Sequence, residues 1–122
     1  MYRFILLIAA LTFSNLPHAR AEEPMCNASF WFRWGQEVSG TLATKAGAPC
    51  RILTGTSGNT VYVGSQVLTQ PRHGRASSIG PASIRYQPRA GFVGQDSMTI
   101  RFLGERQGQR NQATVRLKIT VY

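Results

Sequence analysis

Few residues of this chain could carry out chemistry, and their spacing argues against catalysis. Asp96 is the only aspartate, and Glu105 is separated from it by a stretch whose alternation points the intervening side chains elsewhere. Hydrolysis by paired carboxylates requires both acids in one cleft. His73 is the only histidine after residue 21, and no motif supplies it with a nucleophile and an orienting acid. We therefore expect no enzymatic activity and no cofactor, and we predict that His73 is a structural or exposed turn residue.

The two cysteines, Cys26 and Cys50, favour a disulfide over a catalytic or metal-binding role. Closing a loop of about 25 residues would stabilise a small domain by roughly 3 kcal/mol. Two free thiols are the alternative. Two cysteines and one histidine cannot complete a four-ligand set, so we expect no metal site.

The first 21 residues predict export. Arg3 precedes an apolar run from Phe4 to Phe13, which is shorter than the roughly twenty residues that a membrane-spanning helix needs. Ala19-Arg20-Ala21 has the small-x-small pattern at which signal peptidase cleaves. Residues 22–122 would then form a single domain of a secreted protein, periplasmic or extracellular, that does not span the membrane. An uncleaved membrane anchor is the alternative.

The chain is strongly basic, with 14 lysines and arginines against five acids and a net charge of +9. Without Arg3 and Arg20 the balance is 12 against five, or +7. This excess favours polyanionic partners, and the alternative is that it only keeps the protein soluble. Nucleic acid is a poor partner for an exported protein, and no recognition helix is visible.

Short β-prone runs separated by glycines indicate an all-β sandwich of about seven short antiparallel strands. Alternation is clearest near the end of the chain, where two half-buried strands are predicted. Their inward residues are Met98, Ile100 and Phe102 in the first strand, and Val115, Leu117, Ile119 and Val121 in the second. Residues 104–112 are polar, which predicts a hairpin with a long, mobile loop. The other predicted runs are 38–44, 50–54, 60–63, 66–69 and 83–86.

The predicted hairpin supplies the best candidate for a basic patch. Its members are Arg101, Arg116 and Lys118 on the outer strand face, and Arg106 and Arg110 on the loop. Such a patch suits lipopolysaccharide or another anionic glycan. The alternative is a solvated sheet face whose arginines deter edge-to-edge association.

An aromatic-rich strand is predicted over residues 27–34, with Phe30, Phe32 and Trp34 facing inward. Trp31 and Arg33 lie on the other face. They form either a ligand platform or, as we expect, a surface that a neighbouring loop covers.

The stretch Tyr86–Met98 predicts a tight corner between two strands. Phe92 is the large apolar side chain available to anchor it in the core. We expect Asp96 to accept hydrogen bonds from backbone amides of the turn and of the incoming strand. The residues that define this corner are Tyr86, Pro88, Gly91, Phe92, Gly94 and Asp96.

The C-terminal half resembles the bacterial Ig-like and cadherin-like repeats of exported proteins. The matching residues are Pro71, His73 and Gly74, then the six corner residues, then Ala113, Thr114 and Val115 with the inward face of the last strand. The resemblance implies an immunoglobulin-like sandwich with a role in surface architecture, adhesion or carbohydrate contact. The acids are too few and too scattered for a calcium site. We therefore expect a non-catalytic module that binds a protein or a cell-envelope polysaccharide, with polyanion binding through the hairpin as the alternative.

Overall fold

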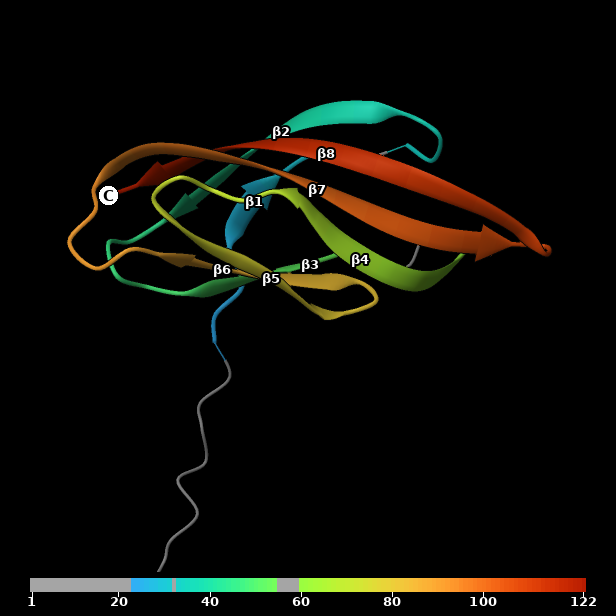
Figure 1. Cartoon of the computed structure of the whole chain (residues 1–122), viewed down its shortest axis with the longest axis horizontal. Helices are drawn as coiled ribbons and strands as arrows, with labels where there is room; N and C mark the ends of the chain where they lie inside the picture. Colours follow the sequence, from blue (N-terminus) through green and yellow to red (C-terminus); the bar gives the residue numbers. More distant parts are fainter. Residues whose placement is uncertain (1–22, 32, 55–59) are drawn as a thin grey trace, which may run out of the picture.

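A computed structural model describes residues 23–31, 33–54 and 60–122, and strands joined by turns make up this part of the chain (Figure 1). The predicted export signal at residues 1–21 lies outside the described residues, as do Phe32 and residues 55–59. No helix occurs in the described part, so the prediction of an all-β fold is confirmed.

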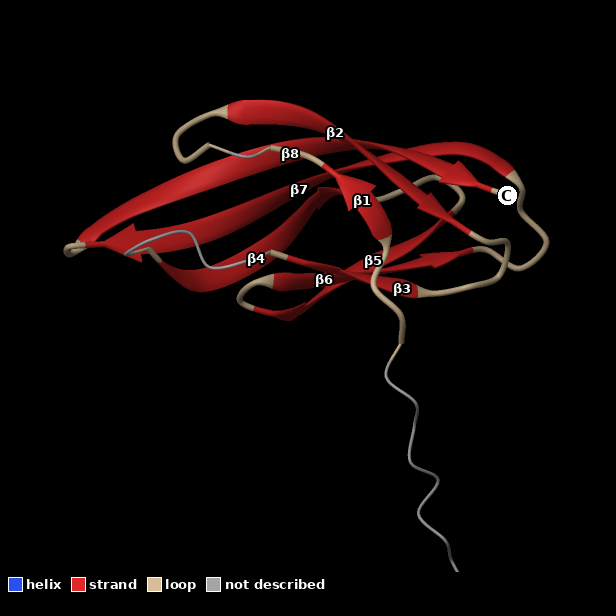
Figure 2. Cartoon of the chain, turned by 180° about the vertical axis from the view of Figure 1, so that it is seen from behind, coloured by secondary structure: helices blue, strands red, loops and turns tan. Residues whose placement is uncertain are grey.

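Eight strands form two sheets that pack face to face as a sandwich (Figure 1, Figure 2). The large sheet has the strand order β1-β2-β8-β7-β4, and the small sheet has the order β3-β6-β5. The strands are β1 Asn27–Ser29, β2 Glu37–Thr44, β3 Cys50–Leu53, β4 Val61–Thr69, β5 Gly74–Gly80, β6 Ser83–Pro88, β7 Gly94–Arg106 and β8 Gln109–Val121.

The prediction that the strands are antiparallel is wrong for one pair, because β2 and β8 run parallel. Glu37 lies opposite Thr114 at one end of this pair, and Thr44 lies opposite Val121 at the other. Parallel neighbours need a long crossover connection. Here β3 to β7 provide it, since the chain passes through the small sheet and returns. Hydrophobic alternation carries no information on strand direction, so the sequence could not show this.

The β7–β8 hairpin is longer and tighter than predicted. Pairing continues without interruption from Gly94 opposite Val121 to Arg106 opposite Gln109. The expected long loop is wrong, because the turn consists of Gln107 and Gly108, with φ of 49° and 75°. Two positive-φ residues match the twist of paired strands, as in a type I′ turn. Figure 1 shows the hairpin extending past the small sheet at one end of the molecule.

The core lies between the sheets, and the two C-terminal strands supply most of it. The predicted inward residues of β7 and β8 are all at most 2% exposed, which confirms the alternation. Ile52, Ile84 and Tyr86 of the small sheet belong to the same cluster. Burying such side chains stabilises the fold by about 1.5–3 kcal/mol each.

Two strands differ from the predicted runs because glycine or polar residues interrupt the hydrophobic alternation that would indicate them. β4 is continuous through Gly64, with bulges at Val63 and Leu68 where its register against β7 shifts. β5 was not predicted at all, because Ala76 is its one buried residue and no apolar alternation results.

The predicted N-terminal strand is much shorter than expected. It is limited to Asn27–Ser29, where it pairs with β2. Phe30 then packs over Gly40, where an added Cβ would lie 2.4 Å from the Cβ of Phe30. Phe30 and Trp34 both pack against the core, on the side that the sequence predicts.

The stretch Tyr86–Met98 carries the chain from the end of β6 in the small sheet to the start of β7 in the large sheet. The amide of Phe92 donates to the carbonyl of Arg89 at 3.0 Å, and Gly91 has a φ of 80°. Tyr86 is fully buried, whereas Phe92 is only half-buried. The deeper anchor of this corner is therefore Tyr86 and not Phe92.

Candidate functional site

Asp96 is buried under the β4–β5 turn, and its carboxylate accepts four hydrogen bonds. Oδ1 accepts from the amides of Arg72 at 3.0 Å and Ser97 at 2.9 Å. Oδ2 accepts from the amide of His73 at 3.1 Å and from the hydroxyl of Tyr86 at 3.0 Å. Asp96 therefore has the structural role that the sequence predicts, joining the turn to β6 and β7.

Tyr86 and His73 complete the environment of this carboxylate. Burial, and then the negative charge of Asp96 and the hydrogen bond to it, raise the pKa of Tyr86 well above its usual range. The ring of His73 stacks on Phe92, with ring centroids 4.2 Å apart and planes within 5°. Its carbonyl accepts a hydrogen bond from the amide of Arg89 at 2.7 Å. These contacts make His73 a packing residue of the corner.

The predicted disulfide between Cys26 and Cys50 is confirmed, with sulfurs 2.05 Å apart. Cys26 directly precedes β1 of the large sheet, and Cys50 begins β3 of the small sheet. The bridge therefore joins the two layers of the sandwich near the start of the described chain.

Carboxylates neutralise part of the predicted hairpin patch. Arg116 forms an ion pair with Glu37, and Arg110 lies opposite Glu105 in the hairpin register. The ion pair offsets the charge of Arg116, and opposite charges in facing strand positions attract, which favours contact between Arg110 and Glu105. Lys118 is exposed near Arg116, beside a shallow groove of about 430 Å³.

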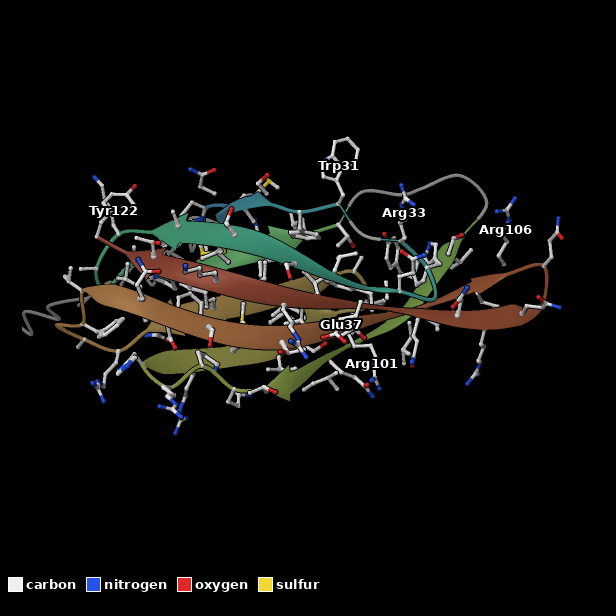
Figure 3. The ribbon with its side chains drawn as sticks, turned by 90° about the horizontal axis from the view of Figure 1, so that it is seen from above. Trp31, Arg33, Glu37, Arg101, Arg106 and Tyr122 are labelled. Carbon is white, nitrogen blue, oxygen red and sulfur yellow. A yellow bond between two sulfur atoms is a disulfide. The ribbon has the colours of Figure 1, made fainter. Side chains whose placement is uncertain are left out.

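Of the other two members of the patch, Arg101 shares the outer face with Arg116, whereas Arg106 does not. Arg101 is half-buried on the outer face, and its Nε is buried with no hydrogen-bond partner among the described residues. Arg106 has the inward parity of Phe102 and lines a small hollow with Trp34 and Asn111. Figure 3 shows Arg101 near Glu37 over the middle of the sheet, well away from Arg106. The five predicted cations therefore do not form one patch.

Trp31 is not covered by a loop, contrary to the expectation. Its side chain is 89% exposed, and Figure 3 shows it pointing away from the ribbon at the edge of the molecule. Arg33 is exposed close by in the sequence. Tryptophan and arginine are the residue types that most often dominate binding interfaces.

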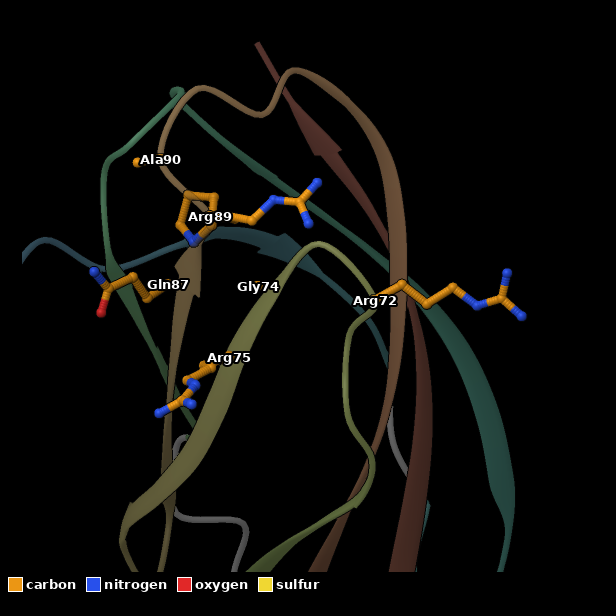
Figure 4. A pocket seen from close by; sticks show the side chains of 7 residues that line it. Arg72, Gly74, Arg75, Gln87, Arg89 and Ala90 are labelled. Atoms are coloured by element: carbon orange, nitrogen blue, oxygen red, sulfur yellow. The ribbon is translucent and has the colours of Figure 1, made fainter.

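A basic cluster that the sequence did not predict lies at the corner. Arg72, Arg75 and Arg89, which we call the corner arginines, surround a hollow of about 310 Å³ (Figure 4). They come from three parts of the fold: Arg72 follows β4, Arg75 lies in β5 and Arg89 follows β6. One signal could have indicated them. Both turns contain a Pro-Arg pair, Pro71-Arg72 and Pro88-Arg89, with the proline buried and the arginine exposed.

The small sheet also carries Arg51 and Arg85 on its outer face, and both contact Glu23. Arg85 forms an ion pair with the Glu23 carboxylate at 2.7 Å, and Arg51 donates to the Glu23 carbonyl at 3.0 Å. The hydrogen bond from Arg85 lowers the pKa of Glu23. These two arginines extend the basic surface away from the corner.

No known protein family and no curated protein sequence matches this chain. Within residues 23–31, 33–54 and 60–122, no helix has the length and apolar character of a membrane span. In the same part of the chain, histidine, cysteine and acidic side chains nowhere gather in threes as a metal site would require.

Proposed function

We propose that this chain is an exported Ig-like module that acts by binding a cell-envelope partner and not by catalysis. The strand order supports an Ig-like assignment. In the Ig lettering, β2, β8, β7 and β4 correspond to strands A′, G, F and C, and β3, β6 and β5 correspond to B, E and D. The parallel pairing of β2 with β8 fits the pairing of strands A′ and G in this correspondence.

Export is supported by two independent features. The described chain contains a disulfide, and disulfides persist mainly in oxidising compartments such as the periplasm and the cell exterior. The first 21 residues have the pattern of a cleaved signal.

The exposure of Trp31 is the observation that carries the binding role. A tryptophan side chain that is 89% exposed leaves a large apolar surface in water. Covering that surface would contribute favourably to association, and Arg33, which is exposed two residues further along the chain, offers a charged group.

The test is capture from envelope fractions separated into protein, lipid and polysaccharide. We expect the wild type to capture one of these components, and Trp31→Ala to bind that component about tenfold or more weakly. Leu53→Ala, which truncates an apolar side chain that is 42% exposed on the small sheet, is the matched control and should retain it. Equal retention by wild type and Trp31→Ala contradicts a role for this surface.

Polyanion binding is the second candidate function, and the corner arginines favour it. Among the described residues no carboxylate forms an ion pair with the side chains of Arg72, Arg75 or Arg89. Unneutralised guanidinium groups attract anionic polymers and pair well with carboxylate, sulfate and phosphate groups.

A further inference from the structure

The two outer faces of the sandwich differ in how far their positive charge is neutralised. The large-sheet face carries Arg101, Arg110, Arg116 and Lys118 against Glu37 and Glu105. The small sheet and its turns carry five arginines against Glu23, and Asp96 offsets part of this charge from below. The strand faces alone carry a similar net charge, and the difference comes from the turn residues Arg72 and Arg89, with which no carboxylate forms an ion pair among the described residues.

The backbone that carries the corner arginines is held in place by hydrogen bonds. The amide of Arg72 donates to Asp96, and the amide of Arg89 donates to the carbonyl of His73. Gly74 pairs with Pro88 across β5 and β6, and a Cβ added to Gly74 would lie 2.4 Å from the carbonyl oxygen of Gln87. The two turns are thus fixed against each other, which lowers the entropy cost of binding a ligand there.

The shape of the surface favours a polymer over a single small anion. Figure 4 shows Arg72 and Arg89 extending in the same direction, while Arg75 lies beside Gln87 on the other side of Gly74. The three arginines line the hollow, but their guanidinium groups point in different directions and do not converge on one point. A second hollow of about 660 Å³ shares Arg75 and Gln87 with the first and continues to Ser77 and Arg85.

We propose that an anionic polysaccharide binds across the corner arginines at this end of the sandwich and continues over the outer face of the small sheet toward Arg85. The acidic groups of successive sugars pair with Arg72, Arg75 and Arg89, because guanidinium offers two parallel donors to such groups. The side-chain amide of Gln87 and the hydroxyl of Ser77 contact sugar hydroxyls. This proposal rests on the polyanion-binding function and names its site and its ligand class.

The experiment compares two triple variants by calorimetric titration with a size-defined heparin oligosaccharide in about 0.15 M salt, where long-range charge effects are largely screened. The first variant is Arg72→Gln/Arg75→Gln/Arg89→Gln. The matched control is Arg106→Gln/Arg110→Gln/Lys118→Gln, which removes the same charge from exposed positions of the hairpin. We expect at least about tenfold weaker binding for the first variant and less than about threefold for the control.

Equal losses in both variants, or a larger loss in the control, overturn the site but leave polyanion binding standing. Neutral dextran, inorganic phosphate and anionic phospholipid vesicles form the other arms. If the wild type binds neither the oligosaccharide nor the anionic vesicles, polyanion binding and the site are overturned together. Binding to vesicles without binding to the oligosaccharide contradicts a glycan ligand. If the first variant melts earlier than the wild type, the single variants Arg75→Gln and Arg89→Gln make the same comparison.

Discussion

Tyr86 and Asp96 show how single residues hold the corner together. The Tyr86 hydroxyl is buried and donates to a carboxylate that also receives three backbone amides. A hydrogen bond to a charged acceptor contributes about 1.5–3 kcal/mol. Ionised Tyr86 would place a second negative charge beside the first, and for this reason the folded protein disfavours it.

We therefore expect Tyr86→Phe to lower the free energy of unfolding by about 1.5–3 kcal/mol at neutral pH. The pKa of Tyr86 is raised in the folded state. Its contribution is accordingly complete below the unfolded pKa of about 10 and is lost progressively as the pH rises from there through the higher pKa of the folded state. The difference between wild type and variant should begin to shrink above about pH 10 in urea denaturation. Tyr122→Phe, at an exposed position, is the control, and a difference that stays constant with pH would contradict the role of the hydroxyl.

At the scale of elements, the β7–β8 hairpin depends on a turn residue that is not the best suited to its conformation. Gln107 has a φ of 49°, a region in which asparagine is several-fold enriched over other non-glycine residues. Asparagine followed by glycine is a preferred sequence for such a turn.

Gln107→Asn should therefore stabilise the protein by roughly 0.5 kcal/mol, because asparagine adopts a positive φ at lower cost and the substitution removes no contact from the core. Thermal unfolding would measure this as a small rise in Tm. Gln109→Asn, made in the neighbouring strand, should give no gain. A fall in Tm for Gln107→Asn would mean that the turn does not have this geometry in solution.

The elements that could be predicted from the sequence are those whose side chains alternate between core and solvent. The inward residues of β7 and β8 show this pattern, and so does the predicted run 38–44, which corresponds to β2. β5 and the outer half of the hairpin are polar on both faces, so their pairing follows from neighbouring strands and leaves no periodic signal. The parallel pairing of β2 with β8 is a property of chain topology, which no local pattern encodes.

At the scale of the whole molecule, the disulfide joins two layers that otherwise meet mainly through apolar packing. Reduction should lower the free energy of unfolding by about 2–4 kcal/mol, because the unfolded chain regains the freedom of a loop of 24 residues. Thermal melts with and without reductant measure this effect. The double variant Cys26→Ser/Cys50→Ser should melt at a lower temperature and respond little to reductant. Equal melting of the wild type under both conditions would contradict a stabilising bridge.

The candidate binding surfaces were harder to predict than the fold, because surface charge depends on which segments meet in space. The hairpin cations lie close together in sequence, yet Glu37 approaches Arg116 from another strand. The corner arginines come from three segments, and the fold brings them together. Trp31 was placed on the correct face, but the presence of a covering loop could not be judged from local sequence.

The bulged strand β4 affects how copies of the protein behave at high concentration. β4 is an edge strand of nine residues without a charged side chain, a composition that invites strands of other molecules to add to the sheet. The extra residues Val63 and Leu68 interrupt the regular spacing of backbone donors and acceptors along this edge. We therefore expect this backbone irregularity to protect the edge against fibrous aggregation, and straightening β4 to remove that protection without changing the charge of the protein.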